Sequence, residues 1–227
     1  MAFFLAFLVL TSIILPAVTL SQPGRLGLSL VFGLALIFGA LATIRHRFVI
    51  CLVICLTACA FVVDLLAEFS PRAYLPILVT ALKLCGLLIL IYMTLKQTLR
   101  PGPVTVYRVI GGIAGYLLIG LTWAWAYQLI EQQIPGAVHF QPALPVNPAR
   151  QVGHWIYFSF VTLTTVGYGD VQPINPVART LAVAEALVGQ LYIAILIASL
   201  VGMALQTKSV EHPATPEEPA ALPRSRD

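Results

Sequence analysis

Six consecutive residues combine small, aromatic and acidic side chains with two glycines, in the order Thr165, Val166, Gly167, Tyr168, Gly169, Asp170. In an ordinary strand, successive carbonyl groups point to opposite sides. Glycine readily adopts backbone angles that other residues avoid, so Gly167 and Gly169 can turn consecutive carbonyls toward one axis. Oxygens held in this way can replace the hydration shell of a cation such as K+. We expect residues 165–168 to present their carbonyls to the ion, with the Thr165 hydroxyl closing the inner end.

A single copy of this run cannot surround an ion. The chain contains one copy, so four chains must meet around a cyclic axis to complete the coordination shell. The sequence therefore predicts a homotetramer.

The run from Thr165 to Asp170 resembles the selectivity filter of the tetrameric potassium channels and is called the filter run below. The resemblance is strong over residues 104–205 and only architectural over residues 1–100. It implies a passive, potassium-selective channel in which K+ is the permeant ion and no cofactor is needed.

A short helix is expected before the filter run. Residues His154 to Thr165 contain neither glycine nor proline and are largely apolar. A helix of roughly 12 residues is about 18 Å long, which is too short for a hydrocarbon core of about 30 Å. We predict a re-entrant pore helix whose C-terminal end, the negative pole of its dipole, meets the filter and favours a nearby cation.

The composition is that of a membrane protein. Of 227 residues, 59% are hydrophobic and 10% are charged, whereas soluble domains carry about 25% charged residues. The net charge is +4, but the basic residues fall in short loops between apolar runs, so we expect a lipid bilayer and no nucleic acid as partner. The sequence shows no metal-ligand cluster, no nucleophile with a nearby base and no phosphate-cradling glycine loop outside residues 165–170, so an enzyme is not expected.

Six apolar runs are long enough to span a membrane as helices; they cover residues 2–20, 24–44, 48–69, 73–95, 104–130 and 177–205. The expected fold class is an all-α membrane protein with six transmembrane helices, and with the pore helix and filter between the fifth and the sixth. Its expected regions are a four-helix sensor-like domain, a pore domain and a short disordered cytoplasmic tail, at residues 1–100, 101–205 and 206–227. Residues 131–153, rich in proline, are expected to form an ordered or semi-ordered outer loop.

The orientation follows from the Lys and Arg residues outside the spans. With the N-terminus in the cytoplasm, eight lie on the inner side and four on the outer side, which agrees with the positive-inside rule. We expect a multi-pass protein of the plasma membrane with both termini cytoplasmic. The first run can also be read as a signal peptide, but it lacks a basic start and its apolar stretch is longer than usual, which favours a retained span.

The fourth apolar run carries Lys83 alone, whereas voltage-gated relatives carry a basic residue at every third position of this span. Asp64 and Glu68 share one face of the preceding helix at i, i+4 spacing. An intramembrane ion pair of Lys83 with these carboxylates can fix helix register or take part in gating, and the first alternative is preferred.

The last apolar run carries the remaining candidate residues. By resemblance, Gly189 matches the hinge of the inner helix. One helical face is expected to line the cavity below the filter, and it consists of Gln190, Ile193, Ile197, Ala198 and Val201. Glu185 is expected to be buried at the level of the filter, either as a functional intramembrane carboxylate or as a protonated or hydrogen-bonded support for the pore helix.

Three alternatives remain open at this stage. Cys51, Cys55 and Cys59 form a stripe that can bind a metal or pack as small apolar side chains, and packing is preferred. A potassium transporter can use filter-like loops, although such proteins resemble four degenerate repeats in one chain. A membrane subunit that regulates but does not conduct is the other rival.

Overall fold

The computed structural model describes residues 24–43, 47–69, 72, 74–98, 105–141 and 148–211. Within these residues the chain forms six helices and two three-residue strands. The first predicted span, residues 2–20, lies outside the described residues, so the six-span count stays a prediction.

Four of the described helices are long and apolar enough to cross a membrane; they are α4 (Arg47–Phe69), α5 (Tyr74–Thr98), α6 (Val106–Gln133) and α8 (Pro176–Glu211). Helix α3 (Gly24–Thr43) contains a shorter apolar segment, Ser29–Ala42. The chain is therefore a multi-pass, mostly helical membrane protein. Each of these helices coincides with one of the predicted apolar runs.

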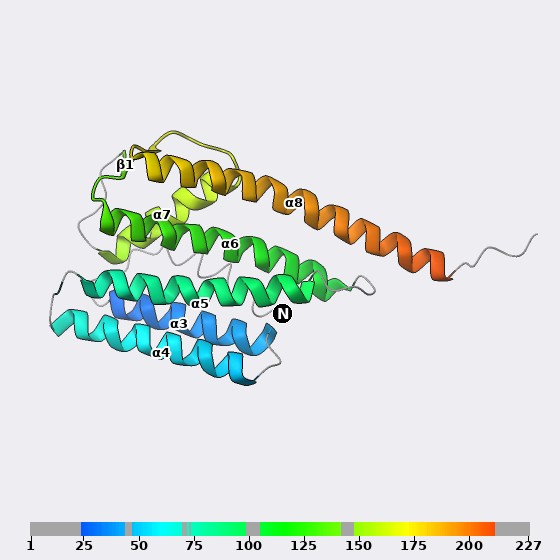
Figure 1. Cartoon of the computed structure of the whole chain (residues 1–227), viewed down its shortest axis with the longest axis horizontal. Coiled ribbons are helices and arrows are strands. Elements are labelled where there is room, and N and C mark those ends of the chain that lie inside the picture. Colours follow the sequence, from blue (N-terminus) through cyan, green and yellow to red (C-terminus); the bar gives the residue numbers. More distant parts are fainter. Residues whose placement is uncertain are drawn as a thin grey trace, which may run out of the picture.

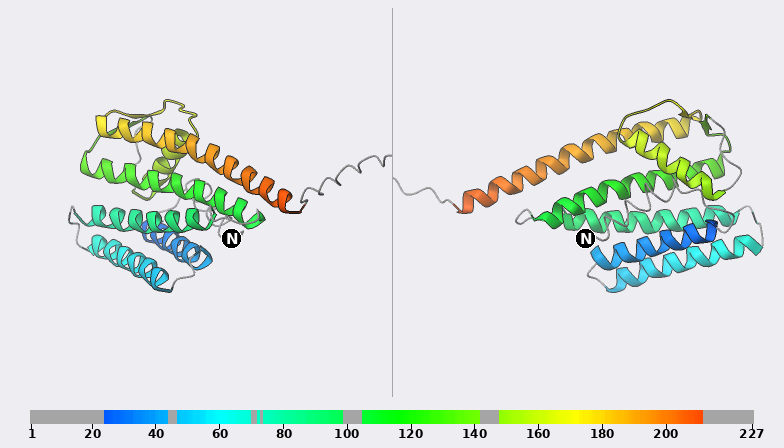
Figure 2. Two further views of the ribbon diagram at one scale, coloured as in Figure 1. Left: turned by 45° about the vertical axis from the view of Figure 1, so that its right-hand side comes forward. Right: turned by 180° about the vertical axis from the view of Figure 1, so that it is seen from behind.

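The helices lie roughly along one direction in adjacent layers (Figures 1 and 2). Helices α3, α4 and α5 pack together, α5 packs extensively on α6, and α7 (Pro148–Leu163) packs between α6 and α8. The largest buried side chains of this core include Trp155, Tyr127 and Leu118. Because α5 contacts α6 of the same chain, the predicted sensor-like bundle of α3, α4 and α5 rests directly on the helices that flank the filter run.

Two short strands were not expected, one within the predicted outer loop and one after the filter run. Strand β1 (Val138–Phe140) pairs antiparallel with β2 (Val171–Pro173), with His139 opposite Gln172. Valine and phenylalanine favour such extended pairs, and the Glu131 carboxylate accepts hydrogen bonds from the backbone N–H groups of Gly136 and Val138. The pairing ties the end of α6 to the residues that directly follow the filter run.

The helix before the filter run differs from the predicted range of residues 154–165. Helix α7 begins six residues earlier, at Pro148, and ends two residues earlier, at Leu163. Proline is well tolerated in the first helical turn, and Gly153 did not interrupt the helix. With 16 residues it is about 24 Å long, still too short to cross the hydrocarbon core.

The C-terminal tail prediction was wrong for its first six residues. Helix α8 continues through Glu211, because no proline or glycine occurs between Gln206 and Glu211; the first proline of the tail is Pro213. Residues 212–227 lie outside the described residues. With 36 residues, α8 is roughly 54 Å long and extends well past the other helices (Figure 1).

The cysteine stripe does not pack in the core of this chain. Cys51, Cys55 and Cys59 are all exposed on α4. Within the described part of the chain, no group of three or more His, Cys, Asp or Glu residues can hold a metal ion. The stripe therefore faces away from this chain's own core.

Candidate functional site

Along the filter run, the backbone φ angle alternates in sign from one residue to the next. Helix α7 ends at Leu163, and a turn at Thr164 and Thr165 leads into irregular backbone. The φ angles are 59° at Thr165, 56° at Gly167 and 83° at Gly169, whereas Val166 and Tyr168 keep negative values. Such an alternation points successive N–H groups to one side, and the carbonyls therefore point to the other. This is the geometry that a row of carbonyl ligands requires.

Thr165 is the one non-glycine residue with a positive φ among the described residues. A β-branched residue strongly disfavours this conformation, which persists only when the surroundings enforce it. The Thr165 N–H donates to the Thr162 carbonyl at 2.9 Å, and its hydroxyl donates to the Thr164 carbonyl at 2.7 Å. The Gln190 amide of α8 donates to the same hydroxyl at 3.2 Å. The inner end of the filter run is thus held from both α7 and α8.

The outer end of the filter run is held by three further hydrogen bonds. Tyr157 of α7 donates to the Asp170 carboxylate at 2.7 Å, and this hydrogen bond raises the pKa of Tyr157 to about 12. Gln172 donates to the Gly169 carbonyl at 3.0 Å, and the Gln141 N–H donates to the Asp170 carbonyl at 2.9 Å. Sequence reasoning missed Tyr157, since nothing in the sequence relates it to a residue 13 positions later.

Much of the filter run is uncovered in a single chain. Val166 is 52% exposed and Tyr168 is 72% exposed. The predicted cavity face of α8 is uncovered as well, because Gln190, Ile193, Ile197, Ala198 and Val201 are all exposed. Apolar side chains so exposed beside a carbonyl row indicate that one chain supplies only part of the site.

Gly189 lies where α8 crosses the C-terminal end of α7. A Cβ atom at this position would be 2.2 Å from the carbonyl oxygen of Leu163, the last residue of α7. The absence of a side chain therefore permits the close approach of the two helices directly before the filter run. A hinge at Gly189 stays a prediction, and the structure gives this glycine a packing role.

A buried carboxyl group joins three helices behind the filter run. Glu185 of α8 is fully buried, and its two oxygens contact Tyr127 of α6 at 2.6 Å and Ser159 of α7 at 2.5 Å. Of the two alternatives for Glu185, this geometry matches support of the pore helix.

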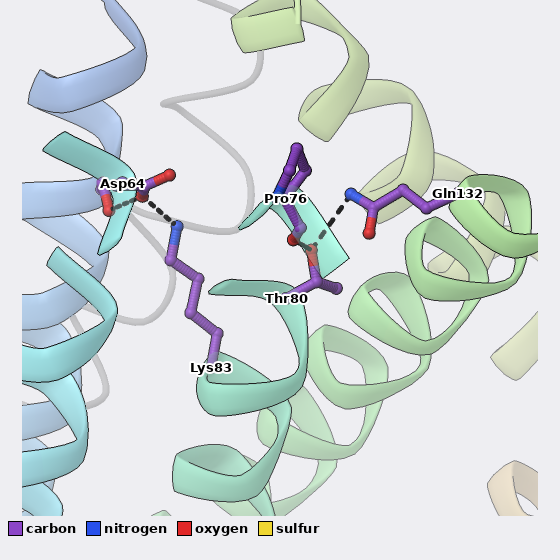
Figure 3. Close-up of polar contacts among 6 residues, drawn as sticks. Asp64, Pro76, Thr80, Lys83 and Gln132 are labelled. Atoms are coloured by element: carbon purple, nitrogen blue, oxygen red, sulfur yellow. Dashed lines mark hydrogen bonds and ion pairs between the residues drawn. The ribbon is translucent and has the colours of Figure 1, made fainter. Parts of the chain in front are cut away.

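The predicted ion-pair residues lie in the sensor-like bundle and not at the filter run. Lys83 Nζ of α5 is 2.9 Å from the Asp64 carboxylate of α4, as Figure 3 shows. Asp64 also accepts a hydrogen bond from Ser29, and Lys83 lies 4.9 Å from the ring centroid of Trp125 on α6. The Glu68 side chain lies outside the described residues.

A second polar contact connects the bundle to α6. Gln132 of α6 donates to the Thr80 hydroxyl of α5 at 3.1 Å, and that hydroxyl donates to the Pro76 carbonyl (Figure 3). Together with the contact of Lys83 with Trp125, this hydrogen bond holds α5 against α6.

Comparison with known proteins supports a channel assignment for the C-terminal half. The family model described as "Ion channel" matches residues 115–206. Two pore potassium channel c of Oryza sativa subsp. japonica is 36% identical over 86 residues, which are 35% of this chain and 19% of that protein. Protein LctB of Bacillus caldotenax is 37% identical over 86 residues, which are 36% of this chain and 61% of that protein.

The chain thus spans less than two thirds of the length of either relative. No solved structure matches it significantly. The family match covers α7, the filter run and most of α8. Residues 115–206 are therefore similar to proteins of the ion channel family.

Proposed function

We propose that this chain is one subunit of a homotetrameric channel of the plasma membrane that conducts K+ selectively down its gradient. The observation that carries the proposal is the alternation in the sign of φ along the filter run, inside a segment that matches the ion channel family model. The name of one relative, a potassium channel, supports the same choice of ion.

The chemistry is the exchange of water oxygens for protein oxygens. K+ sheds its hydration shell as carbonyls of residues 165–168 from four chains surround it, and several adjacent sites let ions displace one another. The negative end of the α7 dipole favours the cation on the inner side. No cofactor takes part.

Four-fold assembly explains the exposure pattern. The filter run and the cavity face of α8 expose Val166, Tyr168, Ile197 and Val201 by more than half of their surface. Around a four-fold axis, the same surface of every chain faces the axis, and the four surfaces together enclose the pathway for the ion.

Purified protein in liposomes tests this proposal. We expect a tetrameric mass in detergent, and K+ release from loaded liposomes that protein-free liposomes do not give. A tetramer without flux would favour the non-conducting subunit, and a monomer with flux would favour a transporter.

We expect the open probability to depend only weakly on voltage. Lys83 is 8% exposed and paired with Asp64, so it is held in the bundle and moves little across the field. Even a full crossing of one charge per subunit would contribute about 9 kcal/mol per 100 mV for four subunits. Recording open probability from about −120 to +120 mV in symmetric K+ measures the slope.

The Lys83→Gln variant is expected to keep the shallow slope. Because this change removes the lysine cation beside the buried Asp64 carboxylate, the double variant Asp64→Asn/Lys83→Gln is the matched control for stability. A wild-type curve as steep as that of an arginine-rich sensor would contradict the expectation.

A further inference from the structure

Glu185 is a carboxyl group that is buried from solvent in an apolar stretch of α8. Its side chain is 0% exposed, and it lies in the part of α8 that is apolar enough to cross a membrane. In the described part of the chain it forms no ion pair. The groups that face it are the hydroxyls of Tyr127 and, further off, Tyr116 from α6, and the hydroxyl of Ser159 from α7. An ionised carboxylate in such a place is very costly.

The Ser159 hydroxyl makes two close oxygen–oxygen contacts, and only one of them would contain a hydrogen if Glu185 were ionised. The Ser159 hydroxyl lies 2.5 Å from Glu185 Oε1 and 2.7 Å from the Gly120 carbonyl oxygen of α6. A serine hydroxyl carries one hydrogen, so it can donate to only one of these two oxygens. With an ionised Glu185, the other close oxygen–oxygen contact would contain no hydrogen.

A protonated Glu185 satisfies every contact. Its Oε1–H donates to the Ser159 hydroxyl, which donates onward to the Gly120 carbonyl. The Tyr127 hydroxyl donates to Oε2 at 2.6 Å. Three hydrogens then serve three hydrogen bonds, and each polar group has a partner.

We propose that Glu185 is neutral in the folded channel and that, through Ser159, it is a positioning residue for the filter run. The proposal rests on the proposed function. Ser159 lies four residues before the end of α7, and the filter run follows directly, so the position of α7 fixes the start of the carbonyl row. The Glu185 carboxyl group on α8 holds α6 and α7 in place through its hydrogen bonds. It does so near Gly189, where α8 approaches α7 closely.

Glutamine at position 185 is the discriminating substitution. Its amide N–H can donate to Ser159 and its oxygen can accept from Tyr127, so Glu185→Gln keeps the neutral arrangement. We expect this variant to retain the wild-type ratio of K+ to Na+ permeability within about twofold. Glu185→Ala, which leaves the Tyr127 hydroxyl without its acceptor and removes the link from α8 to Ser159, is expected to lower this ratio about tenfold or more.

Infrared spectroscopy of the full-length tetramer measures the protonation state independently of conduction. We expect a protonated-carboxyl C=O band in the wild type that persists from mildly acidic to neutral pH and is lost in Glu185→Gln. The thermal midpoint of the Glu185→Gln tetramer should match that of the wild type. A wild type without this band, or a Glu185→Gln variant as impaired as Glu185→Ala, would overturn the proposal.

The two proposals fail in different ways. A wild type that keeps the band but shows no K+ flux would refute the proposed function and leave a neutral Glu185 in place. If the Glu185→Ala chains do not assemble, the infrared carboxyl band and the thermal midpoint of the Glu185→Gln tetramer still show whether Glu185 is neutral.

Discussion

Replacing Gly167 with alanine is expected to abolish K+ current while the chains still assemble. Gly167 has a φ of 56°, and a Cβ added there would meet nothing within 4 Å in this chain. The effect is therefore one of backbone conformation, since a residue with a Cβ loses about 1–2 kcal/mol in the left-handed region. Alanine would favour a negative φ and turn the carbonyl away from its neighbours. Single-channel current and the tetramer fraction in detergent measure the two outcomes.

Gly136→Ala is the matched control for this experiment. Gly136 has a φ of 81° and equally open surroundings, but it lies in the turn between α6 and β1. The backbone cost is similar, so a small loss of stability with normal current is expected. If Gly167→Ala conducts normally, the alternation in the sign of φ along the filter run is not what the ion requires.

Gly189→Ala is expected to lower both the thermal midpoint and the current, the latter by about tenfold or more. Its added Cβ would lie 2.2 Å from the Leu163 carbonyl oxygen, a contact with backbone that no side-chain rotation relieves. Overpacking of this kind costs about 1–3 kcal/mol per chain, and it pushes the end of α7, and with it the filter run, out of place. Thermal unfolding and current recordings of the same preparation measure both effects.

Gly202 provides the control on the same helix. A Cβ added there meets nothing within 4 Å, so Gly202→Ala should be neutral or slightly stabilising, because alanine is the better helix former. The comparison separates the contact with Leu163 from any general effect on helix flexibility. Equal behaviour of the two variants would contradict the packing role of Gly189.

The positions of the membrane-spanning helices could be predicted from the sequence because long apolar runs are enough to identify them. The apolar runs from 48 to 130 and from 177 became α4, α5, α6 and α8. Their ends were less predictable: Pro148 was compatible with starting α7, and the polar residues after 205 were compatible with extending α8. At these positions the local composition is compatible with either a helix or a loop, and packing decides which of the two forms.

The glycines made it possible to recognise the filter run in the sequence, but the contacts that hold its backbone in place could not be predicted. Thr165 takes a positive φ against its β-branched preference, which no local rule predicts. Tyr157 with Asp170, and Gln190 with Thr165, are pairs that only the packing of α7 against α8 brings together. Glu185 could be singled out as a buried carboxylate, whereas its partners Tyr127 and Ser159 come from two other helices.

The reversal potential of the reconstituted wild-type protein tests the central claim most directly. With K+ on one side of a planar bilayer and Na+ on the other, carbonyls spaced for K+ should make the current reverse far from zero, on the side that K+ permeation dictates. The account predicts that this potential follows the K+ gradient as the K+ concentration is varied. A reversal potential near zero with equal concentrations of the two ions, and thus equal permeability, would contradict it.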